Sequence, residues 1–287
     1  MKHSMDETLR QLTIEDYPEN LRQIPGPPEQ LWLRGALAPP GSRYLAVVGS
    51  RALSPYGRQM CELLIKGLSG HPISIVSGLA LGADATAHQA ALDAGLHTTA
   101  VLASGISDNA ISPRTNLELA RSILENGGAL ISENTPDYTP FPSDFPKRNR
   151  IVAGLSDAVL IIEAGERSGT LITARLAGEY SRDLMCIPHN ATDPGSYGAN
   201  LFIRLGAALV TEPRHILEVL GLTQDVSDKD ELLTDAQQSL LTLLETPLHK
   251  EELIDKSALP TTETLTALVS LEMKGLVRER YGKWEQS

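Results

Sequence analysis

The chain has few cysteines, few aromatic residues and no long apolar run. Its two cysteines, Cys61 and Cys186, lie outside any Cys-x-x-Cys or Cys/His cluster, so we expect two small core residues and neither a disulfide framework nor a zinc site. No apolar stretch approaches the roughly 20 residues that cross a bilayer. The N-terminal segment also lacks the apolar core of a signal peptide. These features predict a cytoplasmic protein with no membrane partner.

Several motifs of catalytic chemistry are also missing. The sequence contains no Walker GK[ST], no G-x-G-x-x-G and no G-x-S-x-G, and its carboxylates do not cluster at metal-binding spacing. We find no nucleophile and base pair that the spacing supports. We therefore predict a protein that is not an enzyme, with no catalytic residue, metal or cofactor.

Positive charge is scarce overall but locally concentrated. The formal net charge is −11, which argues against a basic surface throughout but permits a local basic cleft. The stretch FPKRNRIVAG, residues 145–154, places Lys147, Arg148 and Arg150 directly before an apolar run.

Short β-branched runs alternate with helix-like segments from residue 45 onward. The runs occupy 45–50, 73–78, 97–105, 128–133, 157–165, 184–188 and 207–211. The helix-like segments cover about 55–69, 84–94, 115–126, 147–153, 169–181 and 199–205. Near-continuous apolar strands separated by helices are typical of a parallel sheet covered on both faces. The pattern predicts a doubly wound α/β domain over 45–220, with its ligand site at the carboxyl ends of the strands.

The flanking segments differ in composition from this domain. Residues 1–44 form a lead-in rich in proline, in which LWLRG suggests one short strand, and 221–232 form an acidic linker. Residues 233–287 suggest three helices and a two-stranded wing, a winged-helix-like domain. Residues 225–287 hold 13 acidic and 7 Lys or Arg side chains. This charge favours a protein-contact or dimerisation role over phosphate binding.

The first strand-end motif is VVGSRALSPYG. Gly49 allows close approach of the backbone to an anion, the Ser50 hydroxyl can donate a hydrogen bond, and Arg51 can bind a phosphate through two N–H groups. A tight turn with a surface arginine is the alternative.

The second motif is IVSGLALGADATAHQAAL. Ser77, Gly78 and Gly82 supply the hydroxyl and glycines of an anion site. Asp84 is placed as a helix N-cap, and His88 lies four residues later on the same helical face. Capping and packing account for these last two side chains without catalysis.

The third motif is IIEAGERSGTLITARLA. Ser168, Gly169 and Thr170 open a helix, where the free amides and the helix dipole both favour an anion. Capping alone is the alternative.

Taken together, GSRALSPYG, SGLALGADATAHQAAL, FPKRNRIVAGLSDAVLIIEA, SGTLITARLA and LGAALV resemble the DNA-processing protein A (DprA/Smf) family over about residues 45–216. The resemblance implies an extended Rossmann-like domain that binds single-stranded DNA and protects it. It also implies delivery of the strand to the RecA recombinase during natural transformation, a homodimer and no chemical reaction.

The resemblance assigns roles to individual residues. Arg51 corresponds to the family's phosphate-binding arginine, and Ser168 to Thr170 correspond to its Ser-Gly-Thr motif. The family's Arg-Asn-Arg corresponds to Arg148, Asn149 and Arg150, and its backbone- and base-gripping pair to Lys147 with Phe141 or Phe145.

Three positions depart from the family pattern. Leu81 stands where an arginine is usual, His189 where Pro-Gly is usual, and Ser112 with Pro113 where Tyr-Pro is usual. One cationic contact is therefore missing from the expected site.

The basic cluster is expected to divide in two. Lys147 should precede a helix and point at the crevice, whereas Arg148 and Arg150 lead into apolar residues and should be partly enclosed. A buried arginine needs a carboxylate, and Glu133 and Glu163 at strand ends are the candidates.

Two other functions stay open on the same scaffold. Nucleotide phosphoribohydrolases carry a PGGxGTxxE motif that AGERSGTLIT loosely parallels, but Ala174 stands where an acid would be expected nearby. A sensor of a small nucleotide, coupled to the C-terminal domain, is the other.

Overall fold

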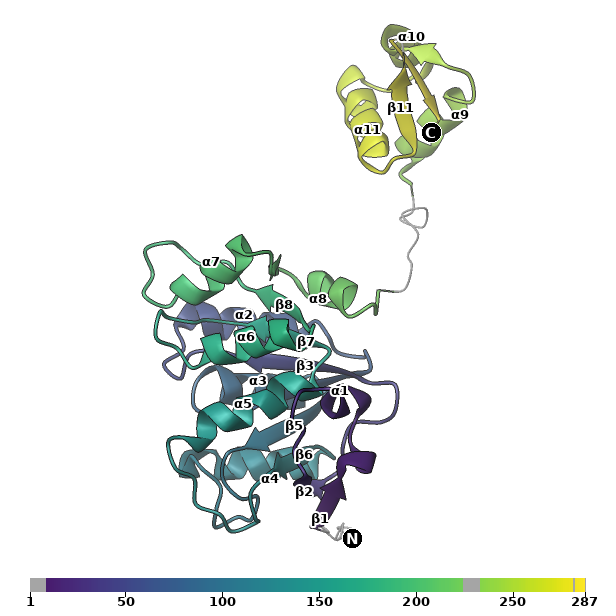
Figure 1. Cartoon of the computed structure of the whole chain (residues 1–287). Coiled ribbons are helices and arrows are strands. Elements are labelled where there is room, and N and C mark those ends of the chain that lie inside the picture. Colours follow the sequence, from purple (N-terminus) through teal and green to yellow (C-terminus); the bar gives the residue numbers. More distant parts are fainter. Residues whose placement is uncertain (1–8, 224–232, 281, 287) are drawn as a thin grey trace. The chain divides into compact units, whose positions relative to one another are not determined.

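The computed structural model describes residues 9–223, 233–280 and 282–286 (Figure 1). The chain divides into two compact units, Met1–Leu222 and Thr223–Ser287. Most of the predicted acidic linker, residues 224–232, lies outside the described residues. None of the helices within the described ranges has the length and apolar character needed to span a membrane.

A nine-stranded sheet forms the centre of the first unit. Its spatial order is β1-β2-β6-β5-β4-β3-β7-β8-β9. The strands are β1 (Arg10–Thr13), β2 (Gln30–Gly35), β3 (Arg43–Val48), β4 (Ile73–Ser77), β5 (His97–Leu102), β6 (Ala129–Ser132), β7 (Ala158–Ile161), β8 (Asp183–Cys186) and β9 (Ala208–Leu209). Neighbours from β6 to β9 along this order pair in parallel, whereas β2 joins β6 and β1 joins β2 antiparallel. The predicted mostly parallel sheet is confirmed, and the lead-in contributes two strands where one was expected.

Helices cover both faces of this sheet (Figure 1). They are α1 (Glu19–Arg22), α2 (Pro55–Lys66), α3 (Ala83–Asp93), α4 (Leu117–Glu125), α5 (Asp144–Leu155), α6 (Thr170–Glu179), α7 (Tyr197–Arg204) and α8 (Pro213–Val219), with short 3-10 turns at Ile14–Asp16 and Arg114–Asn116. Helices α1, α5, α6 and α7 share one core with the sheet. Helices α2, α3 and α8 pack on the other face, where α4 contacts α3. Alternate residues of each strand enter opposite cores, which explains the continuous apolar runs.

The two cysteines follow this division. Cys186 belongs to the core under α5 and α6, and Cys61 to the core under α2 and α3. Both are buried free thiols, as predicted. Burial raises the pKa of each thiol to about 12, so neither is a ready nucleophile.

The second unit is a winged helix, as predicted. It comprises α9 (Asp235–Leu243), β10 (Leu248–His249), α10 (Lys250–Lys256), α11 (Thr261–Met273), β11 (Val277–Arg280) and β12 (Lys283–Gln286). The strands pair in the order β10-β12-β11, so the wing gains a third short strand. Thr234 and Gln237 form a capping box that begins α9. Leu240, Leu268 and Trp284 are among the residues of a separate apolar core. The unit therefore holds the apolar cluster it needs to fold around.

Candidate functional site

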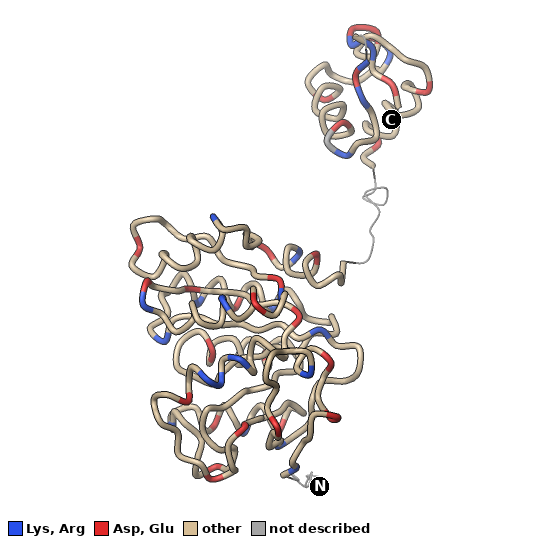
Figure 2. Tube along the Cα trace, viewed as in Figure 1, with Lys and Arg blue, Asp and Glu red and all other residues tan. Residues whose placement is uncertain are grey.

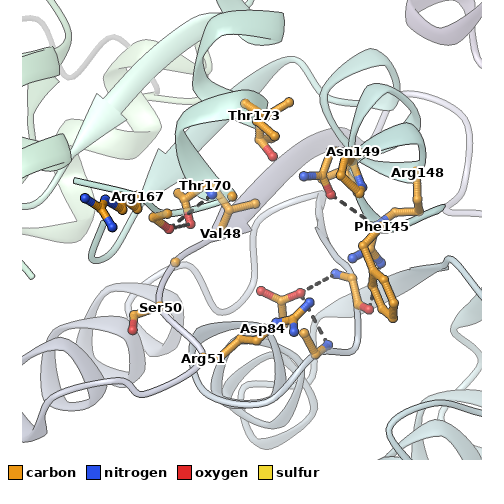
Figure 3. A pocket seen from close by; sticks show the side chains of 18 of the residues that line it. Val48, Ser50, Arg51, Asp84, Phe145, Arg148, Asn149, Arg167, Thr170 and Thr173 are labelled. Atoms are coloured by element: carbon orange, nitrogen blue, oxygen red, sulfur yellow. Dashed lines mark hydrogen bonds between the residues drawn. The ribbon is translucent and has the colours of Figure 1, made fainter. Parts of the chain in front are cut away.

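A cavity of about 690 Å³ lies where the strand order of the large sheet reverses, between β3 and β7 (Figure 3). Its walls come from the β3–α2 loop, the loop after β4, the first turns of α5 and the loop that leads into α6. Parallel strands point their carboxyl ends at this place from both halves of the sheet. The position is the one that doubly wound folds commonly use for a ligand.

The β3–α2 loop brings a cation to the cavity. Gly49, Ser50 and Arg51 all line it. The Arg51 guanidinium lies over the Phe145 ring, 5.2 Å from the ring centroid. Within the described parts of the chain, this exposed side chain forms no hydrogen bond or ion pair. Arg51 is therefore held by an aromatic surface while its N–H groups stay available to an anion.

The loop before α6 supplies the positive end of a helix. The Ser168 Oγ donates to the Thr170 Oγ1 at 2.9 Å, and the Thr170 backbone N–H donates to the Ser168 Oγ at 3.2 Å. Ser168, Gly169 and Thr170 line the cavity together. The N-cap of α6 is Gly169 and no side chain caps the helix, so the two hydroxyls bond within the loop, and the dipole of the ten-residue helix favours an anion here.

Arg167 is a cavity residue that the sequence analysis missed. It precedes the Ser-Gly-Thr motif, lines the cavity and is exposed. Among the residues that the structure describes, none forms an ion pair or hydrogen bond with its side chain. Its position directly before the Ser168-Gly169-Thr170 motif could have indicated from the sequence that Arg167 belongs to the site. Arg167 gives the α6 side of the cavity a cation of its own, to match Arg51 opposite.

Arg148 lines the cavity but is almost wholly buried in its floor. Only 7% of it is exposed, its Nη1 donates to the Gly78 carbonyl at 2.7 Å and to the Val101 carbonyl, and its Nε donates to the Asn149 Oδ1 at 3.3 Å. Burial lowers the pKa of this guanidinium, and the charge of Asp84 opposes that shift. The predicted enclosure is confirmed. Arg148 binds backbone carbonyls and shapes the floor, so it has few N–H groups left for a ligand.

Asp84 is the carboxylate that faces Arg148. Its Oδ2 accepts hydrogen bonds from the backbone N–H of Gly78 at 3.0 Å and of Ala80 at 3.3 Å. Burial raises the pKa of this carboxyl, and positive Arg148 opposes the rise. The Gly78 amide that could have bound a phosphate is consequently occupied by Asp84.

The sequence matches the family described as DNA recombination-mediator protein A over residues 9–221, and the DprA winged helix domain over residues 226–283. The chain belongs to this DprA/Smf family. It is 40% identical over 276 residues to Protein Smf of Escherichia coli strain K12, which covers 92% of the chain and 73% of that relative. It is also 40% identical to the DNA processing protein DprA of Streptococcus pneumoniae over 201 residues, 70% of each chain.

Solved structures of DNA processing protein A from two bacteria are among those that resemble this DprA/Smf chain. The crystal structure of DNA processing protein A from Streptococcus pneumoniae has a TM-score of 0.69 and 39% sequence identity, and covers 74% of both chains. DNA processing protein A from Helicobacter pylori has a TM-score of 0.64 and 28% identity, and covers 75% of this chain and 98% of that one. That second structure concerns a single-stranded DNA binding mode of the Helicobacter protein.

Five residues of the predicted DprA/Smf site do not line the cavity: Ser77, Gly82, Phe141, Lys147 and Arg150. Ser77 is fully buried, and its Oγ donates to the Val47 carbonyl at 2.6 Å, which ties β4 to β3. Gly82 precedes α3 and has a φ of +75°. Neither is among the lining residues, so their contributions are to the sheet and to the backbone of the neighbouring loop.

Lys147 differs from its predicted placement. Helix α5 begins at Asp144, so Lys147 lies inside the helix and does not precede it. Pro146 lies in the first turn of the helix, where its missing N–H is not needed. The Lys147 Nζ lies 3.6 Å from the Asp144 Oδ1, and 70% of the side chain is exposed. Lys147 does not line the cavity.

The two candidate aromatics also separate. Phe145 lines the cavity under Arg51, whereas Phe141 is 65% exposed in the preceding loop and is not a lining residue. The Phe141 ring meets Tyr138 edge-on, with 6.5 Å between the centroids. Phe145 is therefore the aromatic that this DprA/Smf cavity presents to a ligand.

Of the two carboxylates predicted to pair with Arg148 or Arg150, one does so and the other does not. Arg150 forms an ion pair with Glu133 and donates to the Gly26 carbonyl at 3.1 Å, which confirms one pairing. Glu163 pairs with neither arginine: its Oε2 accepts from the Ser54 backbone N–H at 3.1 Å, at the start of α2. Glu163 follows β7, which ends at Ile161, and its carboxylate binds the backbone at the start of α2. The predicted ion pair between Glu163 and an arginine was therefore wrong.

All three departures from the family pattern, Leu81, Ser112 with Pro113, and His189, lie outside the cavity lining. Leu81 is 47% exposed beside α3. The His189 Nε2 is 2.7 Å from the Ile162 carbonyl oxygen, and its ring meets Tyr56 edge-on. His189 therefore has a packing role next to β7, and Leu81 leaves its expected position uncharged.

Proposed function

We propose that the cavity binds single-stranded DNA. One observation carries this proposal: two arginines that form no ion pair within the described residues, Arg51 and Arg167, line one cavity together with the N-terminus of α6 and the aromatic ring of Phe145. Cations and helix amides suit phosphates, and an aromatic face suits a base, with stacking worth about 1–3 kcal/mol per base. Gly49, Ser50, Ser168, Gly169 and Thr170 complete the phosphate-facing wall. Sequence preference should be slight, because every base has a stacking face.

We further propose that the bound strand is protected and passed to the RecA recombinase during natural transformation, by a homodimer. Membership of the DprA/Smf family supports this part of the proposal. It also agrees with the single-stranded DNA binding mode described for the Helicobacter pylori protein.

Binding without chemistry is the proposed activity. Asp84, the carboxylate next to the floor, is buried and bonded to two backbone amides, which makes it a poor general base for a substrate in the cavity. Ala174, which replaces the acid expected of a phosphoribohydrolase, is packed in the core below α6. These two placements favour a binding protein over that enzyme class.

Arg51→Ala tests the proposal. Removing this cation should weaken binding to a single-stranded oligonucleotide and reduce the slope of log affinity against log salt by about 0.7, the value for one phosphate contact on a single strand. Fluorescence anisotropy across a salt series measures both quantities. Arg22→Ala is the matched control, because Arg22 is also an exposed arginine, on α1 and outside the cavity lining.

The combination Arg51→Ala with Arg167→Ala should abolish retention of the oligonucleotide at moderate salt. Affinity and slope equal to those of the unmodified chain, in a folded double variant, would overturn the proposal. Thermal stabilisation by a mononucleotide with no binding of oligonucleotides would favour the nucleotide sensor instead.

A further inference from the structure

Glu163 is a buried carboxylate that does not line the cavity but contacts the start of α2. It follows β7 and is 6% exposed. Its Oε2 accepts a hydrogen bond from the backbone N–H of Ser54 at 3.1 Å, and Ser54 is the N-cap of α2. The two residues are 109 positions apart in the chain. Burying a carboxylate is costly, so we ask what this distant contact provides.

The contact between Glu163 and Ser54 completes a capping box. In a capping box the N-cap hydroxyl accepts from the backbone N–H three residues later, and a Glu or Gln at that later position accepts from the N-cap N–H. The Ser54 Oγ makes the first bond, with the Gly57 N–H at 3.0 Å. Gly57 has no side chain to make the second bond, and Glu163 makes it instead. The fold therefore supplies an acceptor that the local sequence SPYG, residues 54–57, lacks.

Two glycines leave the space that this carboxylate occupies. A Cβ on Gly57 would lie 2.8 Å from the Glu163 Oε2, and a Cβ on Gly195 would lie 2.5 Å from the Glu163 Oε1. The backbone of Glu163 is also close to Gly49, where a Cβ would lie 3.3 Å from its N and O atoms. A side chain at position 57 or 195 would therefore displace the carboxylate from the start of α2.

The Arg51 loop, residues 49–54, is anchored at both ends. Glu163 holds Ser54 at the end where α2 begins. Near the other end, the Ser50 carbonyl accepts a hydrogen bond from the Ala83 N–H at the start of α3. Arg51 lies between these two anchors. The path of this short loop therefore decides where the Arg51 guanidinium can meet a phosphate.

We propose that Glu163 positions Arg51 for a phosphate of single-stranded DNA, because it completes the capping box at the end of the Arg51 loop. This inference rests on the proposed function, since it requires Arg51 to bind a phosphate. Glu163 is a positioning residue that acts through Ser54. Its negative charge would by itself repel DNA, but the positive end of the α2 dipole offsets that repulsion. The hydrogen bond to Ser54 is therefore the property of Glu163 on which binding depends.

Two substitutions at Glu163 separate the hydrogen bond from the charge. Glu163→Gln removes the charge and keeps an acceptor oxygen, so affinity for a single-stranded oligonucleotide should stay within about twofold, as glutamine also serves in capping boxes. Glu163→Asp keeps the charge but is one methylene shorter, so the Ser54 N–H loses its acceptor. We expect Glu163→Asp to bind about three- to tenfold more weakly and to lower the slope of log affinity against log salt by up to about 0.7. Fluorescence anisotropy across a salt series measures both quantities.

A double variant and a second carboxylate serve as controls. In the Arg51→Ala background, Glu163→Asp should cause no further loss of affinity, because the group that Glu163 positions is absent. The Asp157 Oδ2 accepts from the Tyr44 N–H at 2.7 Å, at the opposite end of β3 and outside the cavity lining. Asp157→Ala should therefore lower the melting temperature without changing the affinity for DNA.

Three results would contradict this role while leaving the proposed function intact. Tighter binding by Glu163→Gln would show that Glu163 acts as a repelling charge, and this comparison stands even if Glu163→Asp does not fold. A lower melting temperature of Glu163→Asp with unchanged affinity and slope would show a purely structural role. Losses that multiply in the double variant would place the effect away from Arg51. If the unmodified chain does not bind the oligonucleotide, the proposed function fails and this inference fails with it.

Discussion

Three polar side chains are buried at or behind the cavity wall: Asp84 and Arg148 line the cavity, and His88 does not. Asp84 and Arg148 offset each other's charge, because each is otherwise destabilised by removal from water. His88 is fully buried, and its Nδ1 lies 2.7 Å from the Thr98 Oγ1. Burial, assisted by positive Arg148, lowers the pKa of this imidazole to about 3. The predicted packing role of His88 is confirmed, and the side chain is neutral at physiological pH.

The low pKa of His88 makes the fold sensitive to acid. The unfolded chain binds a proton at His88 below about pH 6.5, whereas the folded chain resists it down to about pH 3. Titration of His88 therefore leaves the free energy of unfolding unchanged above about pH 6.5 and lowers it progressively as the pH falls below that value. We expect it to lower the free energy of unfolding by about 2 kcal/mol between pH 7.5 and pH 5.

Denaturant unfolding of the unmodified chain and of His88→Gln at both pH values measures this contribution. The variant should lose less stability on acidification, because it lacks the titrating group. Comparing the two proteins removes the contribution of Asp84, whose raised pKa acts in the opposite direction. An identical loss in both proteins would show that His88 does not titrate in this range.

At the scale of elements, the start of α3 supports the loop that carries Arg51. The Ala83 N–H donates to the Ser50 carbonyl at 3.0 Å. Gly82 has a φ of +75°, and a Cβ at this position would lie 2.2 Å from the Ser50 carbonyl oxygen and 2.5 Å from that of Arg51. Both obstacles are backbone atoms. Position 82 therefore requires glycine for two reasons: its left-handed backbone conformation and the lack of room for a Cβ.

Gly82→Ala should displace the Arg51 loop. We expect a loss of about 3 kcal/mol or more of unfolding free energy, from the left-handed backbone and the overlap together, and weaker binding of single-stranded DNA. Gly95→Ala is the matched control: φ is +67° there and nothing lies within 4 Å of the added Cβ. That variant should lose only about 1–2 kcal/mol and keep its DNA affinity. Equal losses in the two variants would show that the overlap relaxes without cost.

The elements themselves were largely predictable, whereas the direction of individual side chains was not. Continuous apolar runs such as 157–165 predicted buried strands correctly, because helices cover both faces of the sheet. Ser77 ends such a run, and only the position of Val47 on the neighbouring strand decides that its hydroxyl points into the sheet. Arg148 is likewise buried by Gly78 and Val101, which are distant in sequence. Long-range packing of this kind leaves no mark in local spacing.

On the scale of the whole molecule, charge is distributed unevenly between the two units (Figure 2). Residues 225–287 carry a net charge of −6 out of −11 for the chain. Helix α11, which precedes the wing, contains no Lys or Arg. A winged helix that reads DNA places basic and polar side chains on such a helix, so this one is better suited to contact a protein.

A chain that ends at Leu222 should keep its affinity for single-stranded DNA. The cavity and its arginines lie wholly in the first unit, which has its own apolar cores. At 0.15 M salt, electrostatic repulsion between the acidic second unit and DNA is screened beyond about 8 Å. We therefore expect the full and the shortened chain to bind single-stranded DNA with affinities within about twofold of each other. At low salt the shortened chain should bind more tightly, because an anionic unit no longer repels the strand. Anisotropy titrations at the two salt concentrations measure both effects, and a loss of affinity at either would assign the winged helix a direct part in holding DNA.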